Sequence, residues 1–155
     1  YKAAMRGVAT AVAVITAECE GRRNGLTATA VCSVSAEPAQ LLVCVNRSAT
    51  AEALIRESGR FAVAYLQHSH QEVSRRFSQS KLDETTRFAA GSWRTTDSGI
   101  PVLADAIAYF VCDVVSQETF GTHSVFVGCV TEAQGLEGDP LIYCGGSYSR
   151  LATDS

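Results

Sequence analysis

The most regular strand pattern in the chain reads Leu26-Thr27-Ala28-Thr29-Ala30-Val31-Cys32-Ser33-Val34-Ser35. One face of this stretch is apolar, and the other face, apart from Val31, carries only hydroxyl side chains. Because the side chains of a strand alternate between its two faces, the pattern predicts one strand over 26–35. That polar face can hydrogen-bond a ligand, or it can simply face solvent, where Thr and Ser are common in strands. The hydroxyl residues are Thr27, Thr29, Ser33 and Ser35.

Turn and helix signals lie on both sides of this strand. Asn24-Gly25, just before it, is a strong hairpin signal. After it, residues 41–46 are typical of a buried strand. A short helix to about Ser58 follows, with Ser48 or Thr50 as its N-cap.

The rest of the chain continues as short strands with one more helix. Ser69-His70-Gln71-Glu72 has the form of a capping box, which predicts a helix to about Ser78. Residues 79–90 are polar and charged, which favours a surface connection. Further strands are predicted at 11–17, 61–66, 106–118, 124–132 and 141–144.

This order of elements predicts a mostly β fold. Six to eight strands with two or three short helices, and no βαβ alternation, favour an antiparallel barrel with a few surrounding helices. The strands 106–118 and 124–132 are apolar on both faces, so we expect a helix or a second subunit to cover them. The 155 residues are expected to form a single domain, 1–155.

Composition narrows the class of protein. The chain is 46% hydrophobic and 19% charged, which excludes intrinsic disorder. Its net charge of −3, without a run of basic residues, argues against nucleic acid as a partner. No apolar run approaches the roughly 18 to 20 residues that span a bilayer, so no membrane association is expected. Six cysteines without a C-x-x-C pair are expected to be buried free thiols in a reduced, cytoplasmic protein. The chain lacks an initiator Met, so we expect the native N-terminus to be missing.

Few local motifs point to chemistry. There is no Rossmann, Walker, nucleophile-elbow or zinc-protease motif, and no metal site is predicted, since His68 and His70 are typical of surface residues. Asn46-Arg47-Ser48-Ala49-Thr50 ends a strand and opens a helix, which suits an anion site or a plain capping turn. His123 lies in a Gly-Thr-His turn, where it is either structural or functional.

Taken together, three segments resemble the short-chain flavin reductase family, the NAD(P)H:flavin oxidoreductases that serve two-component monooxygenases. The segments are 25–35, Leu42-Val43-Cys44-Val45-Asn46 with Ser48 and its helix, and Gly121-Thr122-His123. Phe77 and the ending Pro140-Leu141-Ile142-Tyr143 extend the likeness over nearly the whole chain. It is strongest to reductase components of the 4-hydroxyphenylacetate 3-monooxygenase type.

The resemblance implies an FMN-binding split β-barrel, a homodimer that binds FMN or FAD and takes electrons from NADH or NADPH. It places His123 near the nicotinamide, as the catalytic-site residue. It further implies that reduced flavin is supplied to a separate oxygenase component. The implied flavin-binding residues are Thr27, Thr29, Ala30, Val31, Cys32, Ser33, Ser35, Cys44, Asn46, Arg47, Ser48, Phe77, Lys81 and, near the C-terminus, Tyr148.

Two other functions remain open at this point. Similar proteins use bound flavin to reduce the corrin cob(II)yrinic acid a,c-diamide in cobalamin synthesis, and the sequence does not separate the two electron acceptors. A flavin- or haem-binding barrel without turnover is the alternative from another class. Hydride passes directly from nicotinamide to flavin, so the reductase function does not require an acid–base pair in the sequence.

Overall fold

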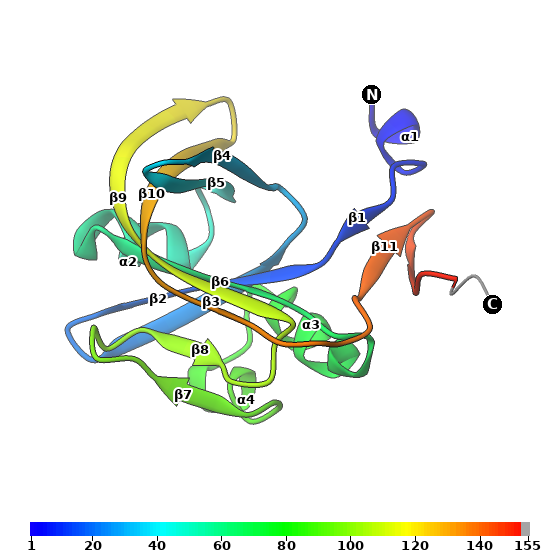
Figure 1. Ribbon diagram of the computed structural model, residues 1–155. Coiled ribbons are helices and arrows are strands. Elements are labelled where there is room, and N and C mark those ends of the chain that lie inside the picture. The colour runs from blue at the N-terminus through cyan, green and yellow to red at the C-terminus, as the bar shows by residue number, and fades with distance from the viewer. Residues whose placement is uncertain (153–155) are drawn as a thin grey trace.

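The computed structural model describes residues 1–152 and contains one seven-stranded sheet at its centre (Figure 1). Its strands follow the order β3-β2-β6-β9-β10-β5-β4, and every neighbouring pair is antiparallel. This confirms the predicted antiparallel β class. The strands are β2 (Ala13–Cys19), β3 (Arg22–Ala28), β4 (Val31–Ala36), β5 (Ala39–Asn46), β6 (Arg60–Tyr65), β9 (Ala108–Phe120) and β10 (His123–Gly135).

The sheet curls so that its two edge strands, β3 and β4, are joined by the link Thr29-Ala30. The Cys44 amide donates a hydrogen bond to the Ala30 carbonyl at 3.0 Å, which holds this link against β5. The prediction of one strand over 26–35 is therefore wrong, because the same stretch has to serve both edges of the sheet. The bend at Thr29-Ala30 lets it pass from one edge to the other.

The Asn24-Gly25 hairpin prediction is also wrong. The turn between β2 and β3 lies at Glu20-Gly21, whose φ angles of 52° and 78° suit a primed hairpin turn. Gly25 lies inside β3, and a Cβ there would sit 2.6 Å from the Ile15 carbonyl oxygen and 2.8 Å from the Phe77 ring. Glycine is required here by the close approach of Phe77, not by a turn.

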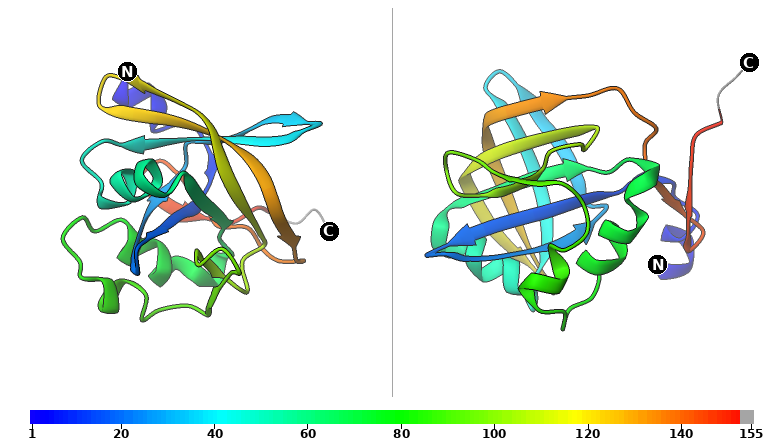
Figure 2. Two further views of the ribbon diagram at one scale, coloured as in Figure 1. Left: turned by 90° about the vertical axis from the view of Figure 1, so that its left-hand side faces the viewer. Right: turned by 90° about the horizontal axis from the view of Figure 1, so that it is seen from below.

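Helix α2 (Thr50–Ser58) fills the interior of the curled sheet (Figure 2). Its apolar residues Leu54 and Ile55 are almost fully buried. They pack against Ala13, Ile15, Ala17, Val43, Val45, Phe61, Val63, Cys112 and Phe126. The helix begins with Ala49 as N-cap and has no side-chain cap, so neither Ser48 nor Thr50 caps it as predicted.

A second apolar cluster lies on the outer face of β2, β6 and β9. It is covered by α3 (Gln71–Phe77) and by the hairpin of β7 (Trp93–Thr95) and β8 (Pro101–Leu103). Alternate residues of β9 enter the two clusters, Val111 the outer one and Cys112 the inner one. The two apolar faces predicted for 106–118 are thus explained, for this half of β9, by cover from within the chain.

The connection into α3 differs in detail from the predicted capping box. A short 3-10 helix, η1 (His68–His70), precedes α3, and the box is formed by Gln67 and His70. The backbone amide of Gln67 donates a hydrogen bond to His70 Nδ1 at 3.1 Å, so the ring proton of His70 is on Nε2. This Nε2 lies 3.2 Å from an Asp105 carboxylate oxygen. Ser69, the first residue of the predicted capping box, is exposed and does not cap the helix.

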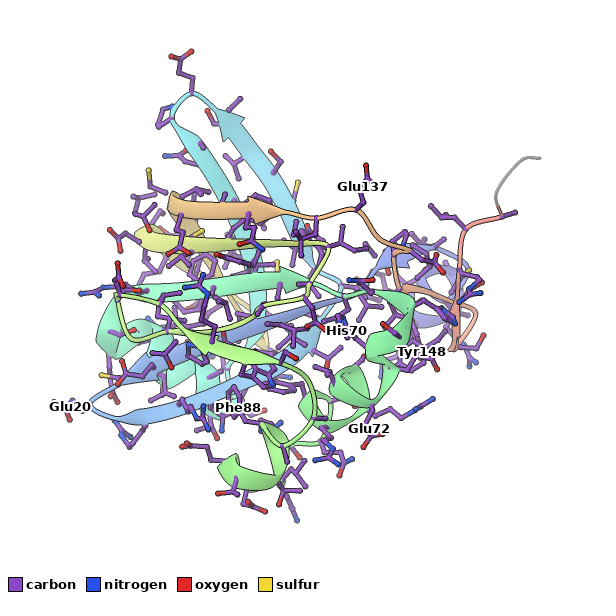
Figure 3. The ribbon with its side chains drawn as sticks, turned by 60° about the horizontal axis from the view of Figure 1, so that its bottom comes forward. Glu20, His70, Glu72, Phe88, Glu137 and Tyr148 are labelled. Atoms are coloured by element: carbon purple, nitrogen blue, oxygen red, sulfur yellow. The ribbon has the colours of Figure 1, made fainter. Side chains whose placement is uncertain are left out.

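The predicted surface connection over 79–90 contains a helix, α4 (Glu84–Arg87), and two buried side chains. Phe88 packs edge-on against Phe77 with ring centroids 5.0 Å apart, and Arg87 is buried beside it. Figure 3 shows Phe88 among the side chains below the sheet. The sequence pattern did not predict this packing, because a charged stretch is typical of an exposed segment.

The two ends of the chain meet in a small sheet of order β1-β11-β12. After α1 (Lys2–Met5), β1 (Thr10–Ala11) pairs with β11 (Ile142–Cys144), which in turn pairs with β12 (Ser147–Ser149). Strand β11 confirms the last predicted strand, while β12 was not predicted.

All six cysteines are free, but their burial varies. Only Cys112 is fully buried, where burial raises its pKa to about 12, and Cys32 is exposed. The prediction of buried thiols is therefore confirmed for Cys112, whereas four cysteines are half-buried and Cys32 is exposed. Within residues 1–152, no helix is long and apolar enough to span a membrane.

Candidate functional site

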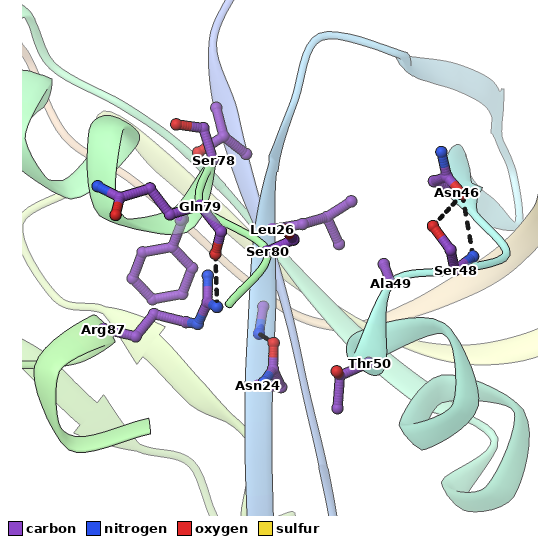
Figure 4. Close-up of a pocket in the computed structure, with 13 residues that line it drawn as sticks. Asn24, Leu26, Asn46, Ser48, Ala49, Thr50, Ser78, Gln79, Ser80 and Arg87 are labelled. Carbon is purple, nitrogen blue, oxygen red and sulfur yellow. Dashed lines mark hydrogen bonds between the residues drawn. The ribbon is translucent and has the colours of Figure 1, made fainter. Parts of the chain in front are cut away.

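A pocket of about 280 Å³ lies between edge strand β3 and the end of β5 (Figure 4). Three segments far apart in the sequence meet there, because the curled sheet brings β3, the β5–α2 junction and the end of α3 together. The lining residues are Asn24, Gly25, Leu26, Thr27, Asn46, Ser48, Ala49, Thr50, Phe77, Ser78, Gln79, Ser80 and Arg87.

The β5–α2 junction supplies hydrogen-bonding groups to this pocket. Asn46 Oδ1 accepts hydrogen bonds from the Ser48 amide at 2.9 Å and the Ser48 hydroxyl at 2.8 Å, which fixes the turn. Helix α2 begins at Thr50 without a side-chain cap. Its first-turn N–H groups therefore carry partial positive charge at the pocket wall, an arrangement that favours an anion.

The end of α3 forms the opposite wall. The Phe77 ring packs on Gly25 and lies 5.1 Å from the Trp93 ring. Next to it, the Arg87 guanidinium donates to the carbonyl oxygens of Arg76 at 3.2 Å, Gln79 at 2.7 Å and Leu82 at 3.0 Å. Burial lowers the pKa of Arg87, yet an arginine stays charged at neutral pH, so this wall holds a cation.

A second pocket of about 270 Å³ continues along β3 and shares Thr27 and Ser78 with the first. Thr27 donates to the Ser74 carbonyl at 2.7 Å, which ties β3 to α3. The Tyr148 hydroxyl donates to the Ser74 hydroxyl at 2.7 Å, and Figure 3 shows Tyr148 next to α3. The remaining lining residues are Val12, Ala28, Thr29 and Tyr143.

These two pockets form one trough with different ends. The first end carries the α2 N-terminus and Arg87, and the second carries Tyr148 and Thr29. Small-molecule sites usually occupy about 300–1,000 Å³, so the two pockets together are large enough for a nucleotide-sized ligand. An anionic group fits the first end, and an aromatic ring system with polar edges fits the second, which is lined by Tyr143, Tyr148 and several hydroxyl groups.

His123 lies at the edge of this region, at the start of β10. It pairs with Asn46 in the β10–β5 ladder, and its Nδ1 lies 2.9 Å from the Thr122 hydroxyl oxygen. The Arg47 amide donates to the Thr122 carbonyl at 3.0 Å. The Gly-Thr-His turn is thus bonded to the Asn46–Ser48 segment, which brings two of the sequence motifs together.

Arg47 itself lines a separate, open hollow that shares only Ser48 with the first pocket. Glu52 and Arg56 of α2 form an ion pair of 2.6 Å in this hollow. Burial raises the pKa of Glu52, but hydrogen bonds from Arg56 and Ser124 outweigh burial and lower it overall.

The other predicted residues are more scattered. Thr27 and Thr29 line the trough, whereas Ser33 and Ser35 line a different hollow beside Tyr65. The bend at Thr29-Ala30 and a β-bulge between Ser33 and Ser35 break the hydroxyl row that the alternation predicted. Outside the linings of these hollows lie Ala30, Val31, Cys32, Cys44 and the exposed Lys81.

Sequence reasoning missed several lining residues. Arg87 was hidden in a polar stretch, and Asn24 was assigned to a turn. Thr50 was not missed, because it belongs to the stretch 46–50 that the sequence offered as an anion site, and it lines the pocket. Also missed were Leu26, Ser74, Ser78, Gln79, Ser80 and Tyr143. Within residues 1–152, no group of three or more His, Cys, Asp or Glu side chains is placed to hold a metal ion.

Two curated relatives resemble this chain along most of its length. FMN reductase (NADH) RutF 1 of Methylorubrum extorquens strain PA1 is 42% identical over 154 residues, covering 97% of this chain and 75% of the relative. The 4-hydroxyphenylacetate 3-monooxygenase reductase component of Pseudomonas aeruginosa is 37% identical over 153 residues, covering 97% and 90%.

The fold is shared with solved structures as well. The Streptomyces globisporus C-1027 NADH:FAD oxidoreductase SgcE6, in complex with NAD and FAD fragments, superposes with a TM-score of 0.91 at 27% identity. The match covers 99% of this chain and 92% of that chain. The resemblance drawn from the sequence motifs is confirmed. Residues 5–152 match the family described as flavin reductase like domain, and the chain belongs to this family.

Proposed function

We propose that this chain is an NADH-dependent flavin reductase, which transfers a hydride from the nicotinamide to FMN or FAD. The single observation that carries the proposal is the trough along β3, with anion-binding groups at one end and the aromatic residues Tyr143 and Tyr148 at the other. The relatives named as NADH-dependent FMN reductases support it. Residues 1–155 act as one domain in this proposal.

The residues of the trough fit a flavin nucleotide. Ser48, Thr50 and the first-turn amides of α2 suit a phosphate, and Arg87 adds positive charge at the same end. Thr27 and Thr29 on β3 offer hydroxyls, and Tyr148 offers an aromatic ring at the other end. Of the residues predicted from sequence, Thr27, Thr29, Asn46, Ser48, Phe77 and Tyr148 line this trough.

For hydride transfer, the side chains need only bind and orient the flavin and the nicotinamide. A bound flavin supplies the two-electron acceptor, so the protein holds donor and acceptor rings in contact. His123 is exposed at the edge of the site, where the Thr122 hydroxyl fixes its ring, and it orients the nicotinamide. No general acid or base is needed, since the flavin exchanges its proton with water.

A separate oxygenase receives the reduced flavin in this proposal. The Pseudomonas aeruginosa relative is named as the reductase component of a monooxygenase. The trough is open to solvent along β3, which suits exchange of the flavin with a second protein.

The chain also acts as a homodimer in this proposal. Beyond Val114, the end of β9 is exposed on both faces, with Val115 at 55% and Phe120 at 65% exposure. The hollow beside Tyr65 and Phe110 adds an apolar groove. Large apolar side chains exposed in this way favour a protein interface. Light scattering at micromolar concentration should give twice 16.5 kDa, and a monomer would contradict this part of the proposal.

The enzymatic proposal is tested by following NADH oxidation with FMN, FAD and riboflavin as acceptors. We expect NADH to be consumed in step with flavin reduction, and NADPH serves as the comparison donor. A cobalt corrin as acceptor separates the corrin-reductase alternative. Binding of flavin without consumption of either nicotinamide would support a binding module and contradict the proposal.

A further inference from the structure

Arg87 is a buried cation that forms no direct ion pair within residues 1–152, although the more distant Asp83 carboxylate partly offsets the effect of burial on its pKa. Its side chain is only 2% exposed, and within residues 1–152 no carboxylate oxygen lies within 4.0 Å of its guanidinium nitrogens. Its Nε is buried and has no hydrogen-bond partner there. Burying an unpaired charge is costly, so a residue of this kind calls for an explanation.

Nearby arginines show the ordinary arrangement. Arg76, eleven residues away, pairs with Glu72 at 2.9 Å, and Arg23 pairs with Glu84 at 2.8 Å. Glu72 and Glu84 are therefore already paired with half-buried arginines. Arg87 instead donates to three backbone carbonyls and to no carboxylate, which lowers the cost of burying its charge without neutralising it.

One of the carbonyls that Arg87 holds belongs to Gln79, which lines the pocket, and the other two flank the same segment. Its bonds reach Arg76 at the end of α3, and Gln79 and Leu82 in the segment that follows. Residues 78–80 of that segment line the pocket, and Figure 4 shows the Arg87–Gln79 bond at its edge. One guanidinium thus fixes the backbone that presents the Ser78 and Ser80 hydroxyls.

We infer that Arg87 is a positioning residue which makes the site prefer phosphorylated flavins, by fixing segment 78–82 and by placing a positive charge without a direct ion-pair partner at the phosphate end. This inference rests on the proposed function. The α2 N-terminus on the facing wall completes the anion-binding end. Riboflavin, which has the same ring and ribityl chain but no phosphate, gains nothing from this arrangement.

The test compares the affinities of FMN and riboflavin in wild type, Arg87→Gln and Arg87→Lys. In the Gln variant we expect the preference for FMN over riboflavin to fall about tenfold, while riboflavin affinity stays nearly constant. Lys keeps the charge and part of the carbonyl contact, so the preference of Arg87→Lys for FMN over riboflavin should lie between those of the wild type and Arg87→Gln. Arg60→Gln is the matched control, since Arg60 also donates to a carbonyl, that of Ser98, outside the trough.

Equal losses of FMN and riboflavin affinity would overturn the inference, because they would indicate a general structural role. An unchanged preference would overturn it too. If the Gln variant does not fold, hydrogen exchange in the wild type decides: amides of 79–82 should be protected more by FMN than by riboflavin. Equal protection contradicts the inference. A wild type that binds neither flavin would contradict the proposed function itself.

Discussion

Gly25→Ala tests how the floor of the trough is built. A Cβ at this position meets the Ile15 carbonyl at 2.6 Å and two Phe77 ring atoms at 2.8 and 3.0 Å, all below the 3.4 Å where ordinary contact begins. The carbonyl belongs to the neighbouring strand and cannot move freely. Phe77 is 2% exposed and is wedged against Phe88 and Trp93. Overpacking of this kind costs about 1–3 kcal/mol.

The free energy of unfolding of Gly25→Ala should therefore fall by about 1–3 kcal/mol in urea denaturation. The thermal midpoint should fall by about 2–4 °C for each kcal/mol. Gly135→Ala is the matched control, since Gly135 lies in a strand with open space around it. FMN affinity should also fall in Gly25→Ala, because the displaced Phe77 ring lines the pocket.

A double-mutant cycle separates this contact from a backbone effect. In the Gly25→Ala background, Phe77→Leu should recover part of the loss, with a coupling energy of about 0.5–3 kcal/mol. Strictly additive effects of the two substitutions would refute the reasoning. So would a Gly25→Ala protein as stable as the wild type.

The remaining predictions concern catalysis and pH. His123→Ala should raise KM for NADH and lower kcat about tenfold with flavin affinity unchanged, in steady-state kinetics and flavin titration. Lost flavin binding with a normal KM would instead place His123 against the flavin. Hydrogen bonds from Arg94 and Tyr109 lower the pKa of Glu132, so its contribution to stability is present above the unfolded pKa and lost as pH falls through the folded one. The stability difference between wild type and Glu132→Gln should accordingly shrink on acidification, and a constant difference would contradict this.

The sequence predicted the fold well because strand periodicity and the family motifs agree. It failed where one stretch serves two strands, since alternation over 26–35 does not show the bend at Thr29-Ala30. The Asn24-Gly25 pattern gave a wrong turn prediction, because Gly25 is required by the close approach of Phe77, more than fifty residues away in the sequence. Local patterns hold no information about such long-range packing.

The site was predictable in part for the same reason. Motif residues of the β5–α2 junction and the Gly-Thr-His turn meet as expected, because β5 and β10 are neighbours. Arg87 could not be found, since its burial depends on the folded protein, where its guanidinium lies 5.7 Å from the centre of the Phe77 ring. A charged residue in a charged stretch is predicted to face solvent.

Anaerobic mixing of the FMN-bound protein with NADH tests the central claim most directly. Flavin absorbance should bleach with one flavin reduced per NADH oxidised, at a rate that saturates with NADH and slows with deuterium at the transferred C4 position. Flavin that binds but stays oxidised in the presence of excess NADH would contradict it.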